Sequence, residues 1–375
     1  MTPGRAGAGM PLRAGPVRWS AQSMTSTSDV VVVGAGIVGA SVAYHLARTG
    51  ADVVLLDKAL PASGASGDSF AWIGRGTADA PSEQLLLRRA VLEDYRRLER
   101  ELGGVRVRWT GSLSWGHNEP TVSNGTLPDW QLVEAALVTR LEPHLQTVPA
   151  RAELRADDGA VDPVAVTEAL VDGARDHGAR IRTGVAAHGL PVQDHHVVGV
   201  QTSAGFLPAR MVVLASGADA PTLCAPLGFD LPVAPSPAVL MRFSASAGVV
   251  RTLIANDHLE VREATDGHLL VASDYDGQTS QQELDRAGQR MLDQLRSSFS
   301  GTDDVELVSV RVGVRPMPTD GSPVIGLVPT VAGAYLTVMH SGVTLAPTVG
   351  RLVAREIVDG VDTDELQPLR PSRFT

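Results

Sequence analysis

Lysine is nearly absent from this chain. Of its 32 basic residues, 31 are arginines and only Lys58 is a lysine. Chemistry that needs a lysine amine, such as Schiff-base formation, is therefore excluded unless Lys58 performs it. Acidic residues number 42, and the formal net charge is −10. Because nucleic-acid binding needs a basic surface, this balance argues against a nucleic-acid partner.

Cysteine and long apolar runs are equally scarce. The single cysteine, Cys224, excludes an internal disulfide and a thiolate metal cluster. We expect it to be a small packed residue, in a protein of a reducing compartment such as the cytoplasm. No apolar run approaches the roughly 20 residues of a membrane helix, so no membrane span is expected. His195 and His196 are adjacent and would point to opposite faces of a strand, so no metal site is predicted.

The rest of the composition is that of a globular protein, with 43% hydrophobic residues. A chain of 375 residues suggests two or three domain-sized units. Residues 1–28 are rich in Gly, Pro, Ser, Thr and Ala and lack the apolar core of a secretory signal. They are interpreted as a disordered leader. A true start at Met24 and a cleaved targeting peptide are alternatives, the second less favoured.

The first ordered elements form a strand–helix–strand unit. A β-branched run at 30–33 predicts a buried parallel strand, and it leads into GAGIVG at 34–39. A helix follows and stops at Gly50, and a second strand at 53–56 ends at Asp57. This is the length and order of a βαβ unit.

The glycines of this unit match the GxGxxG fingerprint of a dinucleotide site. Gly34 permits a tight turn, Gly36 lets the backbone approach a pyrophosphate, and Gly39 lets helix and strand pack closely. Asp57 is placed to accept hydrogen bonds from a ribose diol. An acid there disfavours a 2′-phosphate, although the neighbouring Lys58 weakens that argument. The motif alone leaves FAD and NAD open.

Further periodic segments alternate between helix and strand. Helices are predicted at 83–102, 163–177, 281–298 and 344–359, a hairpin at 197–207, and several strands within 231–275. The other predicted strands lie at 105–109, 112–115, 179–185, 211–215 and 335–339. Dinucleotide-type elements thus occur at the start, middle and end of the chain, with strand-rich pieces between them. This order indicates two domains that exchange the chain several times.

Four segments carry a family resemblance. They are the βαβ unit, GASGDS at 64–69, VVLASGA at 212–218, and a late group comprising GVRP at 313–316, DGSPVIG at 320–326 and HSGVTLAP at 340–347. Together they resemble the FAD-dependent amino-acid and amine oxidoreductases, which include D-amino acid oxidase, glycine oxidase and monomeric sarcosine oxidase. The resemblance covers nearly the whole chain after Ser28.

The resemblance implies an α/β fold of the glutathione-reductase-like, D-amino acid oxidase type. A Rossmann-like FAD-binding domain would comprise 29–80, 155–230 and 310–375. A strand-rich antiparallel substrate domain would comprise 81–154 and 231–309. Non-covalent FAD is implied, since the late region has no cysteine and 62–76 has no histidine to attach it.

The resemblance also implies where FAD makes contact. The loop from pyrophosphate to flavin corresponds to Ala65 and Ser66, and a returning strand to Ala215 and Gly217. The backbone of Val185 would meet the adenine. The backbone N–H groups of Gly342, Val343 and Thr344 would face the flavin, where the positive end of a helix stabilises negative charge. A simple N-cap with Pro347 in the first turn is the alternative, and both can hold.

Two catalytic residues are implied. Arg315 matches the arginine that holds the substrate carboxylate, and a guanidinium offers a planar fork for this task. The alternative is a structural pair with an acid such as Asp320, and Arg311 is a weaker candidate for the same role. His340 would lie near flavin and substrate and orient the amine. Its alternative is to cap the end of a strand.

One departure from the family is evident. Glycine oxidase-like and D-amino acid oxidase-like enzymes place a tyrosine in the strand leading to the active site, and the stretch at 258–262 has none. Glu260 or His258 would face the substrate there and could meet a cationic group. The alternative, which is the favoured interpretation, is that they face solvent.

The function implied is oxidation of the C–N bond of a small amino or N-substituted amino acid by hydride transfer to flavin N5. The alternatives are an FAD-dependent 2-hydroxy acid dehydrogenase and a flavoprotein subunit of a larger complex. The electron acceptor is oxygen or another acceptor, and a homo-oligomer or a complex are both open. In sarcosine oxidases a lysine near N5 assists reaction with oxygen. Since Lys58 lies at the other end of the cofactor site, we expect slow reaction with oxygen.

Overall fold

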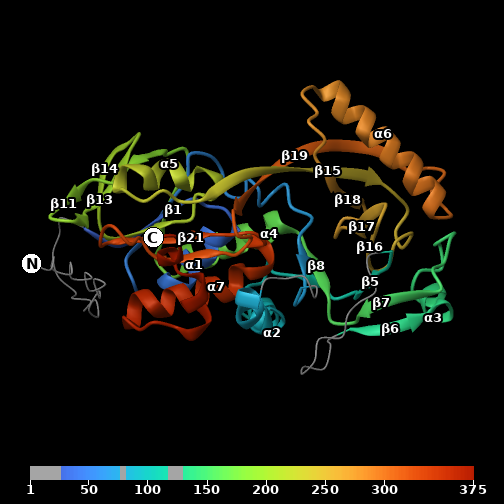
Figure 1. Ribbon diagram of the computed structural model, residues 1–375, viewed down its shortest axis with the longest axis horizontal. Helices are drawn as coiled ribbons and strands as arrows, with labels where there is room; N and C mark the ends of the chain where they lie inside the picture. Colours follow the sequence, from blue (N-terminus) through green and yellow to red (C-terminus); the bar gives the residue numbers. More distant parts are fainter. Residues whose placement is uncertain (1–26, 77–81, 117–129) are drawn as a thin grey trace, which may run out of the picture.

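The computed structural model describes residues 27–76, 82–116 and 130–375, and two large sheets dominate it (Figure 1). The first sheet has the order β10-β13-β14-β1-β2-β9, and β21 and β20 extend it beside β14. The central strands β14, β1, β2 and β21 are parallel. The strands are β1 Ser28–Val33, β2 Val53–Leu56, β9 Arg180–Arg182, β10 Ala187–Gly189, β13 Gly199–Thr202, β14 Gly205–Leu214, β20 Val324–Leu327 and β21 Ala334–Val338.

The valine run at the start of this sheet is buried on both faces. Val30 and Val32 belong to a core shared with α1 (Ile37–Ala47), α4 (Pro163–Asp176) and α7 (Gly342–Asp359). Val31 and Val33 belong to a second core on the opposite face, which includes fully buried Cys224 at the end of α5 (Ala220–Cys224). The expected buried parallel strand and its helix are confirmed. The hairpin expected at 197–207 consists of β13 and the first part of β14. Its second strand continues without a break into the strand expected at 211–215, so that β14 pairs first with β13 and then with β1.

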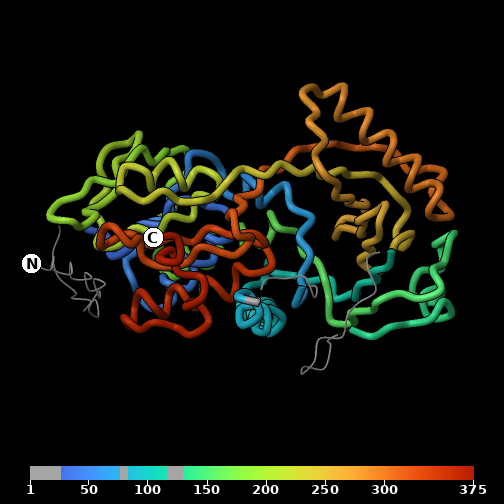
Figure 2. The backbone as a smooth tube through the Cα atoms, viewed as in Figure 1, coloured from blue at the N-terminus to red at the C-terminus, as the bar shows by residue number. Residues whose placement is uncertain are grey.

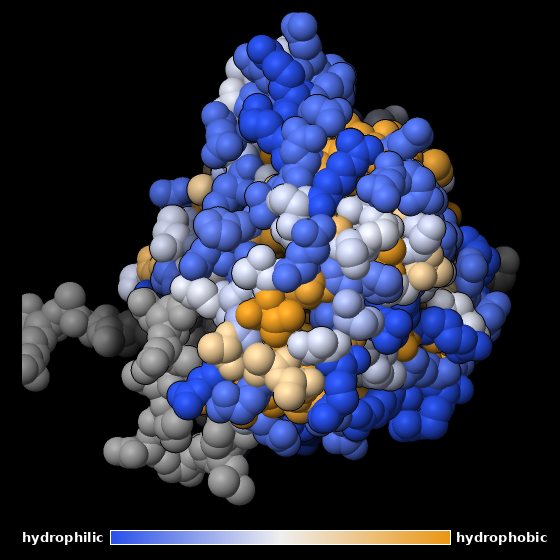
Figure 3. Space-filling model, turned by 90° about the vertical axis from the view of Figure 1, so that its right-hand side faces the viewer, coloured by the Kyte–Doolittle hydropathy of each residue, from blue (hydrophilic) through white to orange (hydrophobic). Residues whose placement is uncertain are grey.

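The second sheet has the order β19-β15-β18-β17-β16-β5-β7-β6. Its strands are β5 Ser112–Ser114, β6 Gln131–Glu134, β7 Arg151–Arg155, β15 Val233–Ser244, β16 Leu253–Asn256, β17 Leu259–Glu263, β18 Leu269–Asp274 and β19 Glu306–Pro318. One face packs on α6 (Gln281–Ser298) and α3 (Ala135–Leu141) through a third core. A capping box between Ser280 and Glu283 fixes the start of α6. The outer surface at this end of the molecule is largely hydrophilic, with a smaller apolar area (Figure 3).

Two long strands connect the two parts of the molecule. β15 and β19 pair in antiparallel fashion from Val233↔Pro318 to Ser244↔Glu306. They run from the side of the first sheet into the second without a break (Figures 1 and 2). A small sheet, β3-β8-β4, with bounds Trp72–Ile73, Gly159–Val161 and Val107–Arg108, lies in the middle of the molecule.

The domain division predicted from the sequence stays a proposal, and the packing of two elements bears on where its boundaries lie. Helix α2 (Leu85–Glu101) was assigned to the substrate domain, yet its buried face, including Leu87 and Tyr95, joins the core around α1 and α7. β19 begins at Glu306 and lies in the second sheet through Pro318. An amphipathic helix reveals that one face is buried but not which core buries it. We therefore retain the division as a proposal, with α2 in the cofactor domain and 306–318 in the substrate domain.

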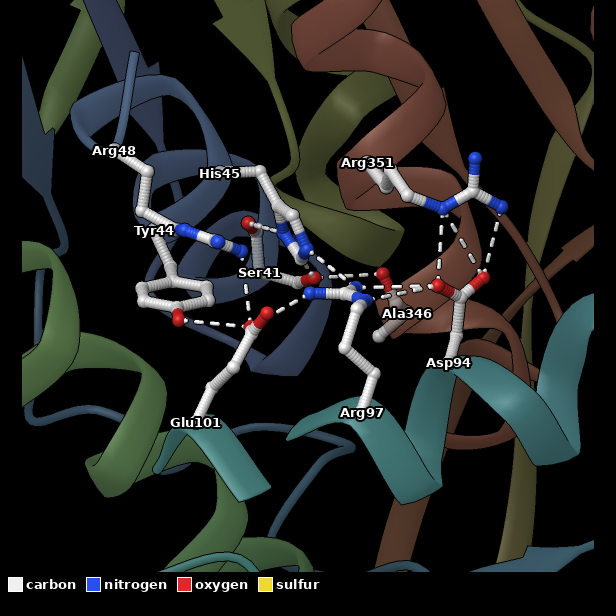
Figure 4. Close-up of polar contacts among 9 residues, drawn as sticks. All are labelled: Ser41, Tyr44, His45, Arg48, Asp94, Arg97, Glu101, Ala346 and Arg351. Atoms are coloured by element: carbon white, nitrogen blue, oxygen red, sulfur yellow. Dashed lines mark hydrogen bonds and ion pairs between the residues drawn. The ribbon is translucent and has the colours of Figure 1, made fainter. Parts of the chain in front are cut away.

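A buried polar network joins α1, α2 and α7 (Figure 4). Asp94 of α2 is 4% exposed and accepts hydrogen bonds of 2.9 Å from both Nε and Nη2 of Arg351 in α7. Arg97 lies 3.1 Å from Asp94 and 2.9 Å from Nε2 of His45 in α1. Burial and the neighbouring Arg97 lower the pKa of His45 to about 3, so its Nε2 accepts from Arg97 while Nδ1 donates to the Ser41 carbonyl.

No helix of the described residues is long and apolar enough to cross a membrane.

Candidate active site

A cavity of about 1280 Å³ extends from the glycine loop to the second sheet. Typical small-molecule pockets measure about 300–1,000 Å³, so this cavity has room for a dinucleotide and a small substrate together. Most of the residues singled out from the sequence line it. They are Gly34, Gly36, Asp57, Lys58, Ala65, Ser66, Ala215, Gly217, Arg315, His340, Gly342, Val343 and Thr344.

The glycine loop leaves no room for side chains at two positions. Gly34 has φ +105°, and a Cβ there would lie 2.5 Å from the Ala215 carbonyl oxygen. A Cβ on Gly39 would lie 1.9 Å from the carbonyl oxygen of Gly34. Gly36 is the N-cap of α1, and the Ile37 N–H donates to Ser66 Oγ at 3.0 Å. Turn, strand and helix are thus held close together, as a pyrophosphate-binding loop requires.

Asp57 has a structural task in addition to the expected contact with a ribose. Its Oδ2 accepts a hydrogen bond of 2.7 Å from the Ala35 N–H, and its Oδ1 accepts one of 2.8 Å from the Ala59 N–H. The carboxylate ties the glycine loop to the end of β2 and still has lone pairs free for a diol. Lys58 forms an ion pair of 2.5 Å with Asp219, which raises the lysine pKa.

Val185 is placed differently from the other expected cofactor residues. It does not line the cavity, and its N–H donates to the Asp57 carbonyl oxygen at 2.9 Å. The residues that follow it, Ala186, Ala187 and His188, do line the cavity. The Val185 N–H is therefore already bonded, and a contact between this segment and an adenine depends on its neighbours or on its carbonyl group.

The N-terminus of α7 opens into the cavity. Its N-cap, Ser341, makes no side-chain hydrogen bond to the helix, so its side chain leaves the N–H groups of the first turn available. Thr344 Oγ1 donates to the Trp72 carbonyl at 2.8 Å, which fixes this turn against β3. Pro347, in the second turn, has no N–H for the Val343 carbonyl. Tyr95 of α2 donates its hydroxyl to that carbonyl at 2.5 Å instead.

Arg315 lies on β19 with its guanidinium directed by Ser236. Its Nε donates to the Ser236 carbonyl at 3.3 Å and its Nη2 to Ser236 Oγ at 3.0 Å. Among the described residues Arg315 has no ion-pair partner. Asp320, the acid considered as its partner, pairs with Arg373 at 2.7 Å. The alternative of an Arg315–Asp320 pair is therefore wrong. Arg311 also differs from expectation, since it pairs with Asp68 at 2.8 Å.

His340 follows β21 and lines the same cavity. Burial, together with the positive charges of Arg315 and Arg88, lowers the pKa of His340 to about 4. The imidazole is therefore neutral near pH 7 and keeps a lone pair that can accept a hydrogen bond.

Glu260 and His258, the two residues weighed for the missing tyrosine, point in different directions. His258 is exposed in the turn before β17, whereas Glu260 lines the cavity. The favoured interpretation of a solvent-facing Glu260 is thus wrong. Burial raises the pKa of its carboxyl group, and the charge of Arg315 lowers it by a smaller amount.

Two further residues, Asp68 and Trp72, lie in the cavity without having been candidates from the sequence. Asp68 lines the cavity, and burial raises the pKa of its carboxyl group despite Arg311. A Cβ on Gly313 would lie 2.8 Å from the Asp68 carbonyl oxygen, so this loop lies directly on β19. Trp72 also lines the cavity, and its Nε1 donates to Asp158 at 2.8 Å. The sequence contains no periodic pattern that would have placed either side chain here.

A family model described as FAD dependent oxidoreductase matches residues 29–356. The chain belongs to this family. The resemblance and the fold class expected from the sequence are confirmed, and FAD is the dinucleotide that this oxidoreductase uses.

Individual relatives of this oxidoreductase are distant. A glycine oxidase of Bacillus licheniformis is 26% identical over 365 residues, covering 93% of this chain and 98% of the relative. A D-amino acid dehydrogenase of Cereibacter sphaeroides is 28% identical over 407 residues, covering 88% of this chain and 92% of the relative. The solved structure of an L-amino acid deaminase from Proteus vulgaris, lacking its specific insertion, superposes with a TM-score of 0.82 at 24% identity over 96% of this chain and 98% of that one. This last likeness shows the fold.

The residues of the cavity fit FAD. The two glycines that cannot carry a Cβ form the expected pyrophosphate loop, and the N-terminus of α7 lies in the same cavity as Arg315. Ser216 Oγ, which lines the cavity, is buried without a hydrogen-bond partner among the described residues, as expected of a group that meets a polar ligand. Gly34, Gly36, Asp57 and Ser66 would hold the nucleotide part.

Proposed function

We propose that this oxidoreductase oxidises the C–N bond of a small amino or N-substituted amino acid whose carboxylate is held by Arg315. The observation that supports this most directly is the unpaired guanidinium of Arg315 inside the cofactor cavity. This guanidinium is half-buried and has no carboxylate partner among the described residues, and a substrate carboxylate would pair with it through charge-assisted hydrogen bonds. Two of the distant relatives are named as enzymes of amino acids, which supports the same substrate class.

Arg315 is prepared for this role by Ser236. Its Nε and Nη2 are occupied by Ser236, which orients the plane of the guanidinium and leaves the Nη1 edge for the ligand. Charge-assisted hydrogen bonds to a carboxylate contribute about 1.5–3 kcal/mol each. The orientation of the carboxylate in turn decides where the α-carbon and the amine of the substrate lie.

His340 is the residue proposed to contact the amine. A neutral imidazole can accept a hydrogen bond from a neutral amine without holding it in its protonated form. Burial and the positive charge of Arg315 lower the pKa of His340 and keep it neutral, and the same charge disfavours a protonated amine at this place. When bound, FAD supplies the acceptor for the hydride that leaves the substrate carbon. The N–H groups at Gly342, Val343 and Thr344 would stabilise negative charge on the reduced cofactor, and binding is proposed to be non-covalent.

Anaerobic mixing tests the proposal. The holoenzyme is mixed with panels of amino acids, N-methyl amino acids and 2-hydroxy acids, and the loss of flavin absorbance near 450 nm is followed. Reduction by amino or N-methyl amino acids is expected. Reduction by hydroxy acids alone would refute C–N oxidation and favour the hydroxy acid dehydrogenase, which the same arginine could serve.

Arg315 variants test the carboxylate site separately. Loss of two charge-assisted hydrogen bonds in Arg315→Met should raise KM by at least about 100-fold. Arg315→Lys keeps the charge but loses the planar fork, so an intermediate value is expected. FAD content should remain that of the wild type in both. Equal loss of FAD would mark Arg315 as structural, and a larger effect in Arg311→Met would move the carboxylate site to that arginine.

A further inference from the structure

Glu260 lies on the face of the second sheet that forms the floor of the cavity. Its neighbours in sequence, Leu259 and Val261, point to the core under α6, so Glu260 points to the opposite face. In the register of the sheet it stands opposite Ala272, which stands opposite Leu240. All three line the cavity. The cavity floor therefore has the Glu260 carboxylate on β17 and the apolar side chains of Ala272 and Leu240 on the next two strands.

The Glu260 carboxylate has no hydrogen-bond or ion-pair partner among the residues that the structure describes. Arg262 is on the same face two residues away, but it does not supply one. Its Nε donates to the Phe70 carbonyl at 2.6 Å, and its Nη2 donates to the Val161 carbonyl at 3.0 Å. Its guanidinium also lies 5.3 Å from the centroid of the Phe70 ring. Arg262 is thus committed to the cofactor loop and to β8, and Glu260 is left for a ligand.

Arg315 and Glu260 can carry opposite charges, and they lie on strands that are not neighbours in the sheet. β15 and β18 separate their strands, which amounts to three strand spacings, or about 14 Å between the strand axes. The two side chains interact electrostatically but form no ion pair within 4.0 Å. The residues of this face that line the cavity between them are small or apolar, namely Ala238, Leu240, Ala272 and Gly313. The register also places Asp274 opposite Ala238 and Arg311 opposite Leu240, and Arg315 stands opposite Ser236, four residues along β15 from Leu240.

We infer that the substrate is an amino acid with a second cationic group at the end of an aliphatic side chain, and that Glu260 binds this distal cation while Arg315 binds the carboxylate. The inference rests on the proposed function, because it assumes that the carboxylate lies at Arg315. Methylene groups would cross the apolar floor, and the distal ammonium or guanidinium would pair with the carboxylate that has no protein partner. Glu260 is thereby a specificity-determining residue.

The reacting amine is proposed to lie near His340, which lines the same cavity as Arg315 and Glu260. The groups that act on His340 electrostatically are Arg315 and Arg88, whereas those that act on Glu260 are Arg315, Asp274 and Arg262. Arg315 is the one group common to both sets, so it lies within electrostatic range of both His340 and Glu260. An α-amine is next to its carboxylate and is proposed to reach His340, while the distal cation is proposed to reach Glu260.

Binding of a carboxylate without an α-amine provides the first test. Pentanoate and 5-aminopentanoate are titrated into the oxidised holoenzyme, and the change of the flavin absorbance spectrum gives Kd. The wild type should bind 5-aminopentanoate at least about tenfold more tightly than pentanoate, as expected of one additional charge-assisted pair. Glu260→Gln should reduce this ratio to about one without changing Kd for pentanoate.

A matched control is Asp274→Asn. Asp274 is an exposed acid on the same face of the sheet, and its substitution changes the net charge by the same amount. The tenfold ratio should persist in this variant. An equal loss of the ratio in both variants would show a general electrostatic field and would overturn the assignment to Glu260. FAD content and thermal midpoint confirm that each variant is folded.

Turnover provides the second test and separates the inference from the proposed function. In anaerobic flavin reduction, kcat/KM for ornithine, lysine or arginine should exceed that for norleucine by about tenfold or more in the wild type and not in Glu260→Gln. Equal rates for cationic and neutral amino acids would overturn the inference and leave the proposed function intact. Reduction by no amino acid, with the pentanoate ratio still dependent on Glu260, would refute the proposed function and the substrate class inferred from it, and would leave only the assignment of Glu260 as a cation-binding residue. Oxidation of 5-aminopentanoate itself would overturn the inference, since the reacting amine would then lie at Glu260.

Discussion

Replacement of Asp94 by asparagine is the most informative test of how the helices around the cofactor site are held together. Asp94 is buried on α2 and receives hydrogen bonds from Arg351 of α7 and Arg97 of its own helix (Figure 4). Asparagine has nearly the same shape but carries no charge. The substitution leaves two guanidinium groups facing a neutral amide, one of whose polar groups is itself a donor.

The expected loss of stability follows from the exposure of the partners. Removing one member of a buried ion pair costs about 3–5 kcal/mol when the remaining charge stays buried. The Arg351 side chain is 38% exposed and the Arg97 side chain 21%, so both can recover part of their hydration. We therefore expect a loss at or below the lower limit of this range, about 2–3 kcal/mol in the free energy of unfolding.

The assay is equilibrium unfolding in urea, followed by tryptophan fluorescence at a fixed excess of FAD. Asp172→Asn is the matched control, because Asp172 pairs with Arg175 on the surface of α4, with side chains 66% and 56% exposed. Exposed pairs contribute about 0.2–1 kcal/mol, so this control should lose far less stability. If Asp94→Asn and Asp172→Asn lose the same amount, the network across α1, α2 and α7 does not stabilise the fold as argued.

Three further predictions concern the cofactor, pH and oxygen. Gly39→Ala should fold but be purified without FAD, as shown by absorbance at 450 nm, because its Cβ would collide with the Gly34 carbonyl at 1.9 Å; normal FAD content would contradict this. Burial alone would raise the pKa of Glu356, but Arg370 holds it below its usual range. Its contribution to stability is then present above the unfolded pKa of about 4.3 and is lost as pH falls through the lower folded value. Thermal midpoints from pH 6 to 3 should therefore fall more steeply in wild type than in Glu356→Gln. Peroxide formation in air should be slow compared with reduction of an artificial dye, because Lys58 follows Asp57 at the nucleotide end of the cavity, where it pairs with Asp219; fast peroxide release at saturating substrate would refute this.

Local sequence patterns predicted the elements whose boundaries are decided locally. The helix expected at 281–298 has these bounds in the structure, because the capping box at Ser280 and Glu283 fixes its start. The strand expected at 53–56 likewise coincides with β2. The glycine loop could be assigned because the close contacts of Gly34 and Gly39 arise within a single βαβ unit.

Features that depend on distant partners could not be predicted in this way. The orientation of Glu260 follows from the register of β17 against β18, and a shift of one residue would turn it to the other face. The engagement of the Val185 N–H depends on Asp57, and the pairing of Asp320 depends on Arg373 near the end of the chain. The sequence indicates that such groups need partners but not which partner the fold brings within reach.

The long strands β15 and β19 also bear on how this enzyme can select its substrate by length. Their ladder keeps one register from Val233 to Arg242 and shifts only between Arg242 and Phe243, so bending the two halves of the molecule toward each other would break hydrogen bonds between paired residues. The flavin end of the cavity and the far end of its floor are therefore joined by a stiff frame, in contrast to enzymes that close two lobes around a ligand. A rigid frame fixes the distance between the two groups that are proposed to bind the ends of the substrate. In a series of ω-amino carboxylates, binding should peak at one chain length and fall on both sides of it.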